Sequence, residues 1–286
     1  MRLNAMLLAP LRLVLLLAHV LGGLLVAALV FPLLLQPARN RINRLWSRNL
    51  LRIAGLRLLV KGEPIEVAVA STGIAAWSRG RLLLANHISW IDVFSINAVV
   101  PTRFIAKAEI GRWPLVGLLV SLAGTLYVER GRRHAVHAIN QKVAERLKLG
   151  ETVGVFPEGT TTDGSLLLPF HANLVQPALD VDGDIRPVAL RYTQRGQPTQ
   201  AAAYVGDDSL IGSLWRIVTA PGLQVEVIWL PRLAAGAATR HVAGQQARAA
   251  IAQALGLPHE TDEFSRPPQP ADTAAAAASD PASASR

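Results

Sequence analysis

Residues 81–92 of the chain read RLLLANHISWID. The apolar run at Leu82–Leu84 has the length and composition of a buried β-strand, and the polar residues after it are typical of a turn. Ser89 is a favourable helix N-cap residue, and Asp92 follows three positions later, at the reciprocal position of a capping box. The stretch therefore predicts a strand, a turn that holds His87, and a helix that begins near Ser89.

The same change from short apolar runs to helical patterns recurs through residues 55–235. The clearest helix is predicted at 132–149, where apolar residues recur every three or four positions and Gly150 ends the pattern. This alternation predicts an α/β fold, with a mixed, largely parallel sheet flanked by helices. The predicted strands are 56–61, 81–85, 103–106, 124–128, 152–156, 186–191, 200–205 and 223–229, and the other predicted helices are 89–99, 113–122, 208–219 and 239–255.

The N-terminal region contains an uncharged apolar stretch, residues 13–35, with the sequence LVLLLAHVLGGLLVAALVFPLLL. A helix of this length can cross a hydrocarbon core of roughly 30 Å. The apolar core of a secretory signal peptide is shorter and ends at small residues, whereas this stretch ends in Phe-Pro-Leu and is followed by arginines. We therefore predict an uncleaved membrane anchor, which either spans the bilayer or, because of Gly22, Gly23 and Pro32, is kinked or re-entrant.

Charge is concentrated next to this anchor. Of the 29 Lys and Arg residues, nine lie in residues 1–61, where there is no Asp or Glu, and the other 20 balance the 20 acidic residues of the chain. This distribution is typical of a segment that meets an anionic membrane surface and argues against a nucleic-acid-binding protein. Most of the nine follow the apolar stretch, which predicts that the bulk of the chain lies on the cytoplasmic side. Residues 41–54 are predicted to form an amphipathic interfacial helix.

Four segments are therefore predicted. They are a transmembrane anchor at 1–36, a basic amphipathic interfacial segment at 37–61, a catalytic domain at 62–260 and a disordered, low-complexity tail at 261–286. The chain contains no cysteine, which excludes a thiol nucleophile and thiolate-ligated metal centres. His134 and His137 have metal-ligand spacing but no acidic companions, so no metal site is predicted.

Two clusters carry the chemistry. His87 and Asp92 could meet across the strand-to-helix turn, although taken alone they also fit a loop histidine and a helix cap. The second cluster, FPEGTTTDG at 156–164, follows the predicted strand 152–156, and ligands bind at the carboxyl ends of strands in open α/β sheets. Taken alone, this cluster also fits a surface turn.

Together, four motifs over residues 80–230 resemble those of the glycerolipid acyltransferase family, typified by 1-acylglycerol-3-phosphate acyltransferases. The motifs, in chain order, are Asn86-His87 with Asp92, Tyr127-Val128-Glu129-Arg130 preceded by Lys107, Phe156 to Thr160, and Arg186-Pro187-Val188. The resemblance implies a glycerol-3-phosphate acyltransferase-like fold with an N-terminal membrane helix. It also implies transfer of a fatty acyl group from a thioester to the free hydroxyl of a lysolipid.

The resemblance implies roles for individual residues. His87 would be the general base and Asp92 its partner, while acceptor binding would fall to Lys107, Arg130, Glu158, Gly159, Thr160 and Thr161. The family has Arg where this chain has Thr161, and Thr cannot form the bidentate bonds of Arg to a phosphate. The expected acceptor is 1-acyl-sn-glycerol-3-phosphate, which would give phosphatidic acid, and lyso-ornithine lipid is the alternative.

The expected partners are membrane lipids and an acyl donor, either acyl-CoA or acyl-acyl carrier protein, with no cofactor and no nucleic acid. The expected location is the inner membrane of a bacterium, and no oligomeric state is predicted. The apolar residues 113–122 fit an acyl groove, a membrane-dipping segment or a core helix. A non-catalytic lipid-binding protein is a more remote alternative, which the presence of both His87 and Asp92 disfavours because a binding protein needs neither.

Overall fold

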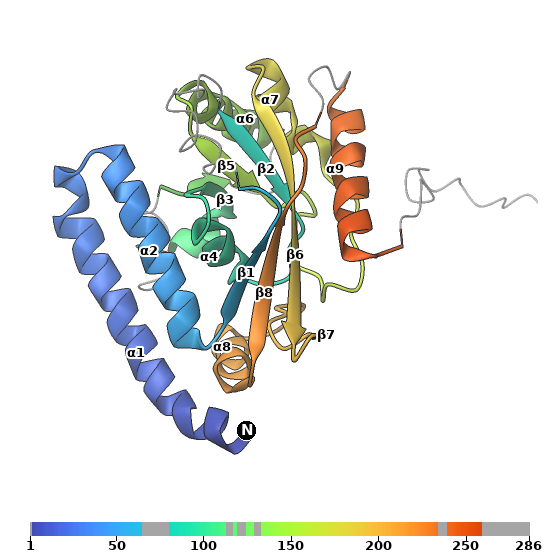
Figure 1. Cartoon of the computed structure of the whole chain (residues 1–286). Helices are drawn as coiled ribbons and strands as arrows, with labels where there is room; N and C mark the ends of the chain where they lie inside the picture. The colour runs from blue at the N-terminus through green and yellow to red at the C-terminus, as the bar shows by residue number, and fades with distance from the viewer. Residues whose placement is uncertain are drawn as a thin grey trace, which may run out of the picture.

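A sheet with helices on both faces forms the centre of the molecule (Figure 1). The computed structural model of the chain describes residues 2–64, 80–112, 117–118, 124–128, 133–233 and 239–258. The strand order is β1-β8-β6-β2-β5-β3-β4, with β7 paired to β6. The strands are β1 (Arg57–Lys61), β2 (Arg81–Ala85), β3 (Arg103–Lys107), β4 (Leu126–Val128), β5 (Thr152–Val155), β6 (Asp184–Gln194), β7 (Gln197–Pro198) and β8 (Leu223–Trp229).

The sheet is mixed and largely parallel, which confirms the predicted fold class. Strand β6 pairs antiparallel with β8 and β7, whereas the other pairs are parallel. Strand β2 is central and all five of its residues are buried. Alternate residues of β2 contribute to two different cores, with Leu82 and Leu84 in one and Leu83 and Ala85 in the other. Both faces of the sheet are therefore covered, as expected of parallel strands.

The helices divide between the two faces of the sheet. Side chains of α4 pack on one face, where α1, α2 and α8 join them, and α6, α7 and α9 pack on the other. The helices are α1 (Arg2–Leu29), α2 (Gln36–Ala54), α4 (Asp92–Asn97), α6 (Arg133–Lys148), α7 (Gln176–Asp180), α8 (Leu210–Thr219) and α9 (Arg240–Leu255). Three 3-10 turns, η1 (Phe31–Leu33), η2 (Ala108–Arg112) and η3 (Ala172–Leu174), complete the described elements.

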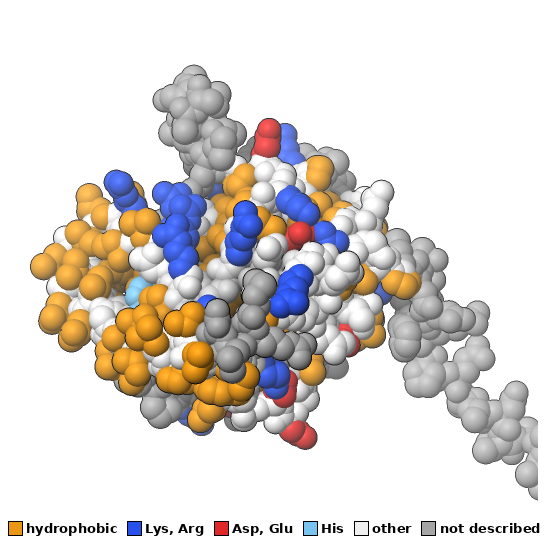
Figure 2. All heavy atoms as spheres, turned by 60° about the horizontal axis from the view of Figure 1, so that its bottom comes forward, with side chains coloured by type: hydrophobic (Ala, Val, Ile, Leu, Met, Phe, Trp, Pro, Cys, Tyr) orange, Lys and Arg blue, Asp and Glu red, His pale blue; other side chains and the backbone are white. Residues whose placement is uncertain are grey.

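Helices α1 and α2 form a hairpin that turns at η1. Gly23 allows the close approach of the two helices, because a Cβ atom at this position would lie 2.5 Å from the Trp46 indole nitrogen. Helix α2 ends at Gly55, whose φ of +86° is the left-handed conformation of a helix C-cap. Residues 6–33 are long and apolar enough to cross a membrane, yet little of this segment is buried in the protein. Figure 2 shows hydrophobic side chains gathered over the part of the surface where α1 lies.

Two local predictions differ from the structure. Residues 200–205 are not a strand but a turn and a loop, because the Tyr204 backbone N–H donates to the Ile88 carbonyl and its carbonyl accepts from the Thr161 hydroxyl. Within residues 37–61, by contrast, the helix predicted at 41–54 lies in α2, and the strand predicted at 56–61 is β1, which pairs with β8. The helix predicted at 89–99 is shorter, since α4 begins at Asp92 and ends at Asn97. Apart from 117–118, the segment 113–122 lies outside the described residues, as does the tail from residue 259.

Candidate active site

The two predicted clusters lie at one edge of the sheet. The first follows β2 and the second follows β5, and these strands are parallel neighbours, with Leu84 paired to Val155. Their carboxyl ends therefore meet, at the location where open α/β sheets bind ligands. A bond of 2.8 Å from the Thr162 backbone N–H to the His87 carbonyl joins the two loops directly.

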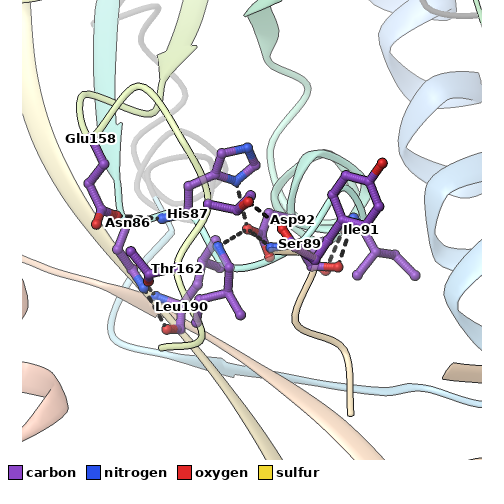
Figure 3. Close-up of polar contacts among 12 residues, drawn as sticks. Asn86, His87, Ser89, Ile91, Asp92, Glu158, Thr162 and Leu190 are labelled. Carbon is purple, nitrogen blue, oxygen red and sulfur yellow. Dashed lines mark hydrogen bonds and ion pairs between the residues drawn. The ribbon is translucent and has the colours of Figure 1, made fainter. Parts of the chain in front are cut away.

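His87 and Asp92 are in hydrogen-bond contact (Figure 3). The Nδ1 atom of His87 lies 2.9 Å from Oδ2 of Asp92, whose carboxylate is fully buried, whereas the His87 side chain is 20% exposed. A carboxylate can only accept at this contact, so in the neutral imidazole the proton is on Nδ1. The lone pair of Nε2 is then available to accept a proton from another molecule.

The Asp92 carboxylate is held by further donors. Its Oδ2 atom also accepts the backbone N–H groups of Ile88 at 2.8 Å and Ser89 at 2.9 Å. Its Oδ1 atom accepts the hydroxyl of Tyr192, in strand β6, at 2.6 Å. Burial, with a contribution from the Asp92 charge, raises the pKa of Tyr192 well above its ordinary value, so this hydroxyl remains a donor. Asp92 is therefore fixed in position with its Oδ2 atom toward His87.

The predicted capping box forms only in part. Asp92 accepts the backbone N–H of Ser89, as that motif requires, but Ser89 does not cap a helix. Its hydroxyl oxygen instead lies 3.5 Å from the Ile91 backbone nitrogen, and Ile91 occupies the N-cap position of α4. The reason is that the Asp92 carboxylate draws the backbone of 88 and 89 around itself, which delays the start of the helix.

Glu158 ties the second loop to the first. Its Oε1 atom accepts the His87 backbone N–H at 2.8 Å and its Oε2 atom accepts that of Leu168 at 2.9 Å. The side chain is buried, and this desolvation raises the pKa of Glu158 to about 7, against the opposing effect of the two N–H donors. Because both of its oxygens accept backbone N–H groups, Glu158 holds the His87 loop in position.

Two further contacts set the position of His87. The ring of Phe156 stacks on the imidazole, with a centroid distance of 3.9 Å and an interplanar angle of 9°. The buried amide of Asn86 bonds to both backbone groups of Leu190, at 3.0 Å and 2.7 Å, which anchors the residue before His87 to strand β6. The imidazole is thus held from its flank and from its backbone.

The other predicted acceptor-binding residues have different surroundings. Gly159 has a φ of +72°, a conformation that favours glycine, and Thr160 is exposed. The Thr161 hydroxyl donates to the Tyr204 carbonyl, so it is engaged by the protein itself. Lys107 ends β3, two strands from β2, and its side chain is not described; Arg130 lies outside the described residues.

A cavity of about 340 Å³ lies close to this site, between the α1–α2 hairpin and α4. Phe104, at its wall, stacks on Phe156 at 5.4 Å, and Phe156 in turn stacks on His87. Two aromatic rings therefore separate the imidazole from the cavity. The lining is mostly apolar and includes Gly22, Val26, Phe31, Val93 and Phe94. Its polar members are His19, Asn43, Asn97, Thr102 and Thr125.

Sequence reasoning missed three residues that shape the site. Tyr192 is 100 positions from Asp92, Tyr204 is 43 from Thr161, and Arg248 of α9 donates to the carbonyls of Leu167 and Leu168 beside Glu158. A tyrosine in a strand and an arginine in a helix are ordinary in sequence. Only the pairing of β6 with β2 could have drawn attention to Tyr192.

Comparison with known proteins agrees with this arrangement. A sequence profile described as Acyltransferase matches residues 60–191. The chain is 36% identical over 219 residues to a lyso-ornithine lipid O-acyltransferase of Pseudomonas aeruginosa, covering 77% of this chain and 80% of that protein. It is 43% identical over 149 residues to a 1-acyl-sn-glycerol-3-phosphate acyltransferase of Neisseria gonorrhoeae, covering 52% and 58% of the two chains.

The fold is also found in a solved structure. The crystal structure of the 1-acyl-sn-glycerophosphate acyltransferase from Thermotoga maritima superposes with a TM-score of 0.63, covering 90% of this chain and 97% of that one. The identity between the two is 19%, so the likeness concerns the fold.

Proposed function

This chain belongs to the glycerolipid acyltransferase family, and from that membership we propose that it transfers a fatty acyl group from an acyl thioester to the free hydroxyl of a lysolipid. The observation that carries the proposal is the 2.9 Å contact between His87 Nδ1 and Asp92 Oδ2. A protein that only binds lipid has no need of a histidine oriented by a buried carboxylate. The chain is an acyltransferase, and the reaction needs no cofactor.

The proposed mechanism uses His87 as a general base. Nε2 takes the proton of the acceptor hydroxyl as the oxygen attacks the thioester carbonyl. The C–O ester bond forms, the C–S bond breaks, and the proton passes to the departing thiolate. Asp92 holds the proton on Nδ1 and stabilises the imidazolium, as the acid does in a Ser–His–Asp triad. The acceptor hydroxyl takes the place of the serine, so no covalent enzyme intermediate forms.

The cavity next to the site suits the acyl chain. Its mostly apolar lining matches a hydrocarbon chain, and the stacked rings of Phe104 and Phe156 lie between it and His87. His19 does not present an unpaired polar nitrogen to this lining at Nε2, because that atom lies 3.0 Å from the Trp46 carbonyl. Its ring stacks on the Trp46 indole. Residues 113–122, the groove expected from sequence, remain a prediction.

Membrane association follows from α1, whose apolar side chains are largely exposed. We propose residues 1–36 as the anchor, 37–61 as the basic segment that meets lipid phosphates, and 62–260 as the catalytic domain, followed by a disordered tail at 261–286. The surplus of arginines after the anchor favours the cytoplasmic side, where acyl-CoA and acyl-acyl carrier protein are made. A lysolipid held in this membrane could reach His87 without entering water.

The acceptor we propose to test first is 1-acyl-sn-glycerol-3-phosphate, the substrate named for the Neisseria relative with 43% identity. A specific observation favours lyso-ornithine lipid as the second candidate. The Thr161 hydroxyl, where the family has an arginine, is bonded to the Tyr204 carbonyl. This residue therefore supplies neither positive charge nor a free donor to a phosphate, so Lys107 and Arg130 would have to bind the phosphate of the first acceptor.

The test compares purified wild type with His87→Ala, supplied with both acceptors and with acyl-CoA or acyl-acyl carrier protein. We expect transfer to be lost in the variant while its circular dichroism spectrum is unchanged, because the Glu158 bond is made to the backbone of residue 87. Full activity of the folded variant would end the proposal. Thr161→Arg then distinguishes the two acceptors. If the natural acceptor is lysophosphatidate, the variant should have nearly the same KM for lysophosphatidate as wild type. If it is lyso-ornithine lipid, the variant should bind lysophosphatidate more tightly than wild type does.

A further inference from the structure

Helix α8 exposes large apolar side chains on its outer face. Ile211 is 81% exposed and Trp215 is 45% exposed. They stand four positions apart and therefore lie next to each other on one side of the helix. The charged residue of α8, Arg216, is turned elsewhere, since it pairs with Asp208 at 2.7 Å and donates to the Ala203 carbonyl at 2.8 Å. The outer face is thus apolar and uncharged.

The inner face of α8 is fixed against α1. Ile217 and Val218 share one buried cluster with Ala9 and Leu16 of α1. Arg12 of α1 also donates from Nη1 to the Val218 carbonyl at 2.5 Å. Because of these contacts, the two helices present their exposed faces as parts of one rigid surface.

The exposed face of α1 beside α8 is itself apolar. Between residues 6 and 17 it exposes seven large apolar side chains, by between 45% and 71%: Met6, Leu7, Leu8, Leu11, Val14, Leu15 and Leu17. In Figure 2 hydrophobic side chains spread over this end of the molecule, and Lys and Arg side chains lie along one side of them. Apolar patches of this extent on a soluble surface mark interaction sites.

We propose that α8 is a second membrane contact, in which Ile211 and Trp215 enter the same lipid leaflet as α1. The occupant is lipid because the face continues the surface of α1, the helix through which the protein associates with the membrane. A tryptophan with an apolar neighbour at a membrane surface is typical of the interfacial zone. Asp207, exposed just before α8, limits the depth to that zone, since a carboxylate is costly in hydrocarbon.

The consequence concerns the orientation of the enzyme. One helix leaves the catalytic domain free to rotate about it, whereas two contacts from distant parts of the sequence set the domain's tilt. Helix α1 packed along α8 then lies along one leaflet, and the cavity between α1, α2 and α4 is held beside the lipid chains. This inference rests on the proposed membrane association through α1, and its test separates the two.

The absence of cysteine from the chain allows a direct test. Single cysteines replace Ile211, Val14 as the α1 reference, and Leu149, which is 69% exposed at the end of α6 on the opposite face of the sheet. Each is labelled with the polarity-sensitive fluorophore NBD and mixed with phosphatidylethanolamine–phosphatidylglycerol vesicles. We expect a blue shift and quenching by spin-labelled lipids at 14 and 211, and neither at 149.

Quenching at 14 without quenching at 211 would overturn the α8 contact and leave the anchor in place. No quenching at any position would overturn both, since the inference depends on the anchor. A second measurement uses Ile211→Glu with Trp215→Glu, and Leu149→Glu as the matched control. Transfer to lysolipid in vesicles should fall roughly tenfold in the double variant, because two apolar contacts are lost, while transfer to lysolipid in detergent micelles is unchanged. Equal losses in both assays would contradict the inference.

Discussion

The most informative substitution in the proposed mechanism is Asp92→Asn. It keeps the size and shape of a buried side chain but removes its negative charge. An amide oxygen in the Oδ2 position still accepts the N–H groups of His87, Ile88 and Ser89. The amide nitrogen then faces the Tyr192 hydroxyl, which can rotate to accept instead of donate. The loop should therefore survive the change.

The expected loss can be worked out from the geometry. During transfer the imidazole becomes positively charged at a contact of 2.9 Å with the carboxylate, which places the two charge centres about 4 Å apart. At an effective dielectric constant of about 20 the attraction is on the order of 4 kcal/mol. Since each 1.36 kcal/mol in the activation free energy is a factor of ten, kcat should fall about a thousandfold.

The assay follows thiol release from acyl-CoA in mixed micelles that contain a saturating lysolipid. Asp180→Asn serves as the control, because Asp180 is exposed at the end of α7 and bonds to Gln176. Circular dichroism and thermal melting report whether both variants are folded. The control should keep wild-type kcat, and Asp92→Asn should lose it with little change in KM.

One result would refute the reasoning. A folded Asp92→Asn enzyme with kcat within tenfold of wild type would show that the carboxylate does not stabilise a charged imidazole. His87 would then act in another way, or another group would be the base. A variant that fails to fold is distinguished by its melting curve, and the Tyr192 substitution below then examines the same carboxylate with less disturbance.

Three further predictions concern the residues around the pair. Tyr192→Phe removes the 2.6 Å bond to Asp92 and should lower kcat roughly tenfold with little change in KM, because the carboxylate that orients His87 loses one of the donors that fix it; an unchanged kcat would assign Tyr192 to packing alone. The pKa of Glu158 is raised from 4.5 to about 7, so its contribution to stability is present at low pH and is lost as the pH rises through 7. The free energy of unfolding of wild type, relative to that of Glu158→Gln, should therefore rise by up to about 3 kcal/mol as the pH falls from above 7 towards 4.5. The difference in melting temperature between the two proteins should change in the same direction, and a difference that does not vary with pH would contradict this. Thr161→Val should cost about 1 kcal/mol of stability, measured by urea unfolding, through loss of the bond to the Tyr204 carbonyl, and should leave kcat unchanged if Thr161 contributes only to the loop.

Local sequence patterns correctly predicted many of the strands and helices of the fold. Strands β2, β5 and β8 lie within one residue of where apolar runs of strand length predicted them, and helix α6 within one residue of its periodic pattern. These elements are buried on one face or on both, so the spacing of their apolar residues follows directly from their burial. The contact of His87 with Asp92 was also expected, because the turn that joins them spans only five positions.

The sequence pattern gave wrong predictions where the backbone forms hydrogen bonds that the local pattern does not show. Residues 200–205 have the composition of a strand, yet the Tyr204 backbone bonds to Ile88 and Thr161 in the site loops. Ser89 is a residue type that often caps helices, yet here its backbone N–H donates to the Asp92 carboxylate and it does not cap α4. In both places a long-range hydrogen bond outweighs the local preference.

By itself, the sequence determined which segments are apolar, where strands turn into helices, and which residues near each turn can exchange a proton. The tertiary structure decided what each of these segments meets: Tyr192 on Asp92 across 100 positions, and Arg12 on the Val218 carbonyl across 206. The physical reason is that periodicity records how much of a residue is hidden from water, whereas a hydrogen bond depends on distance and direction between atoms that chain closure alone brings together. The continuous apolar surface of α1 and α8 belongs to this second kind, because the sequence pattern of neither helix shows that it packs against the other.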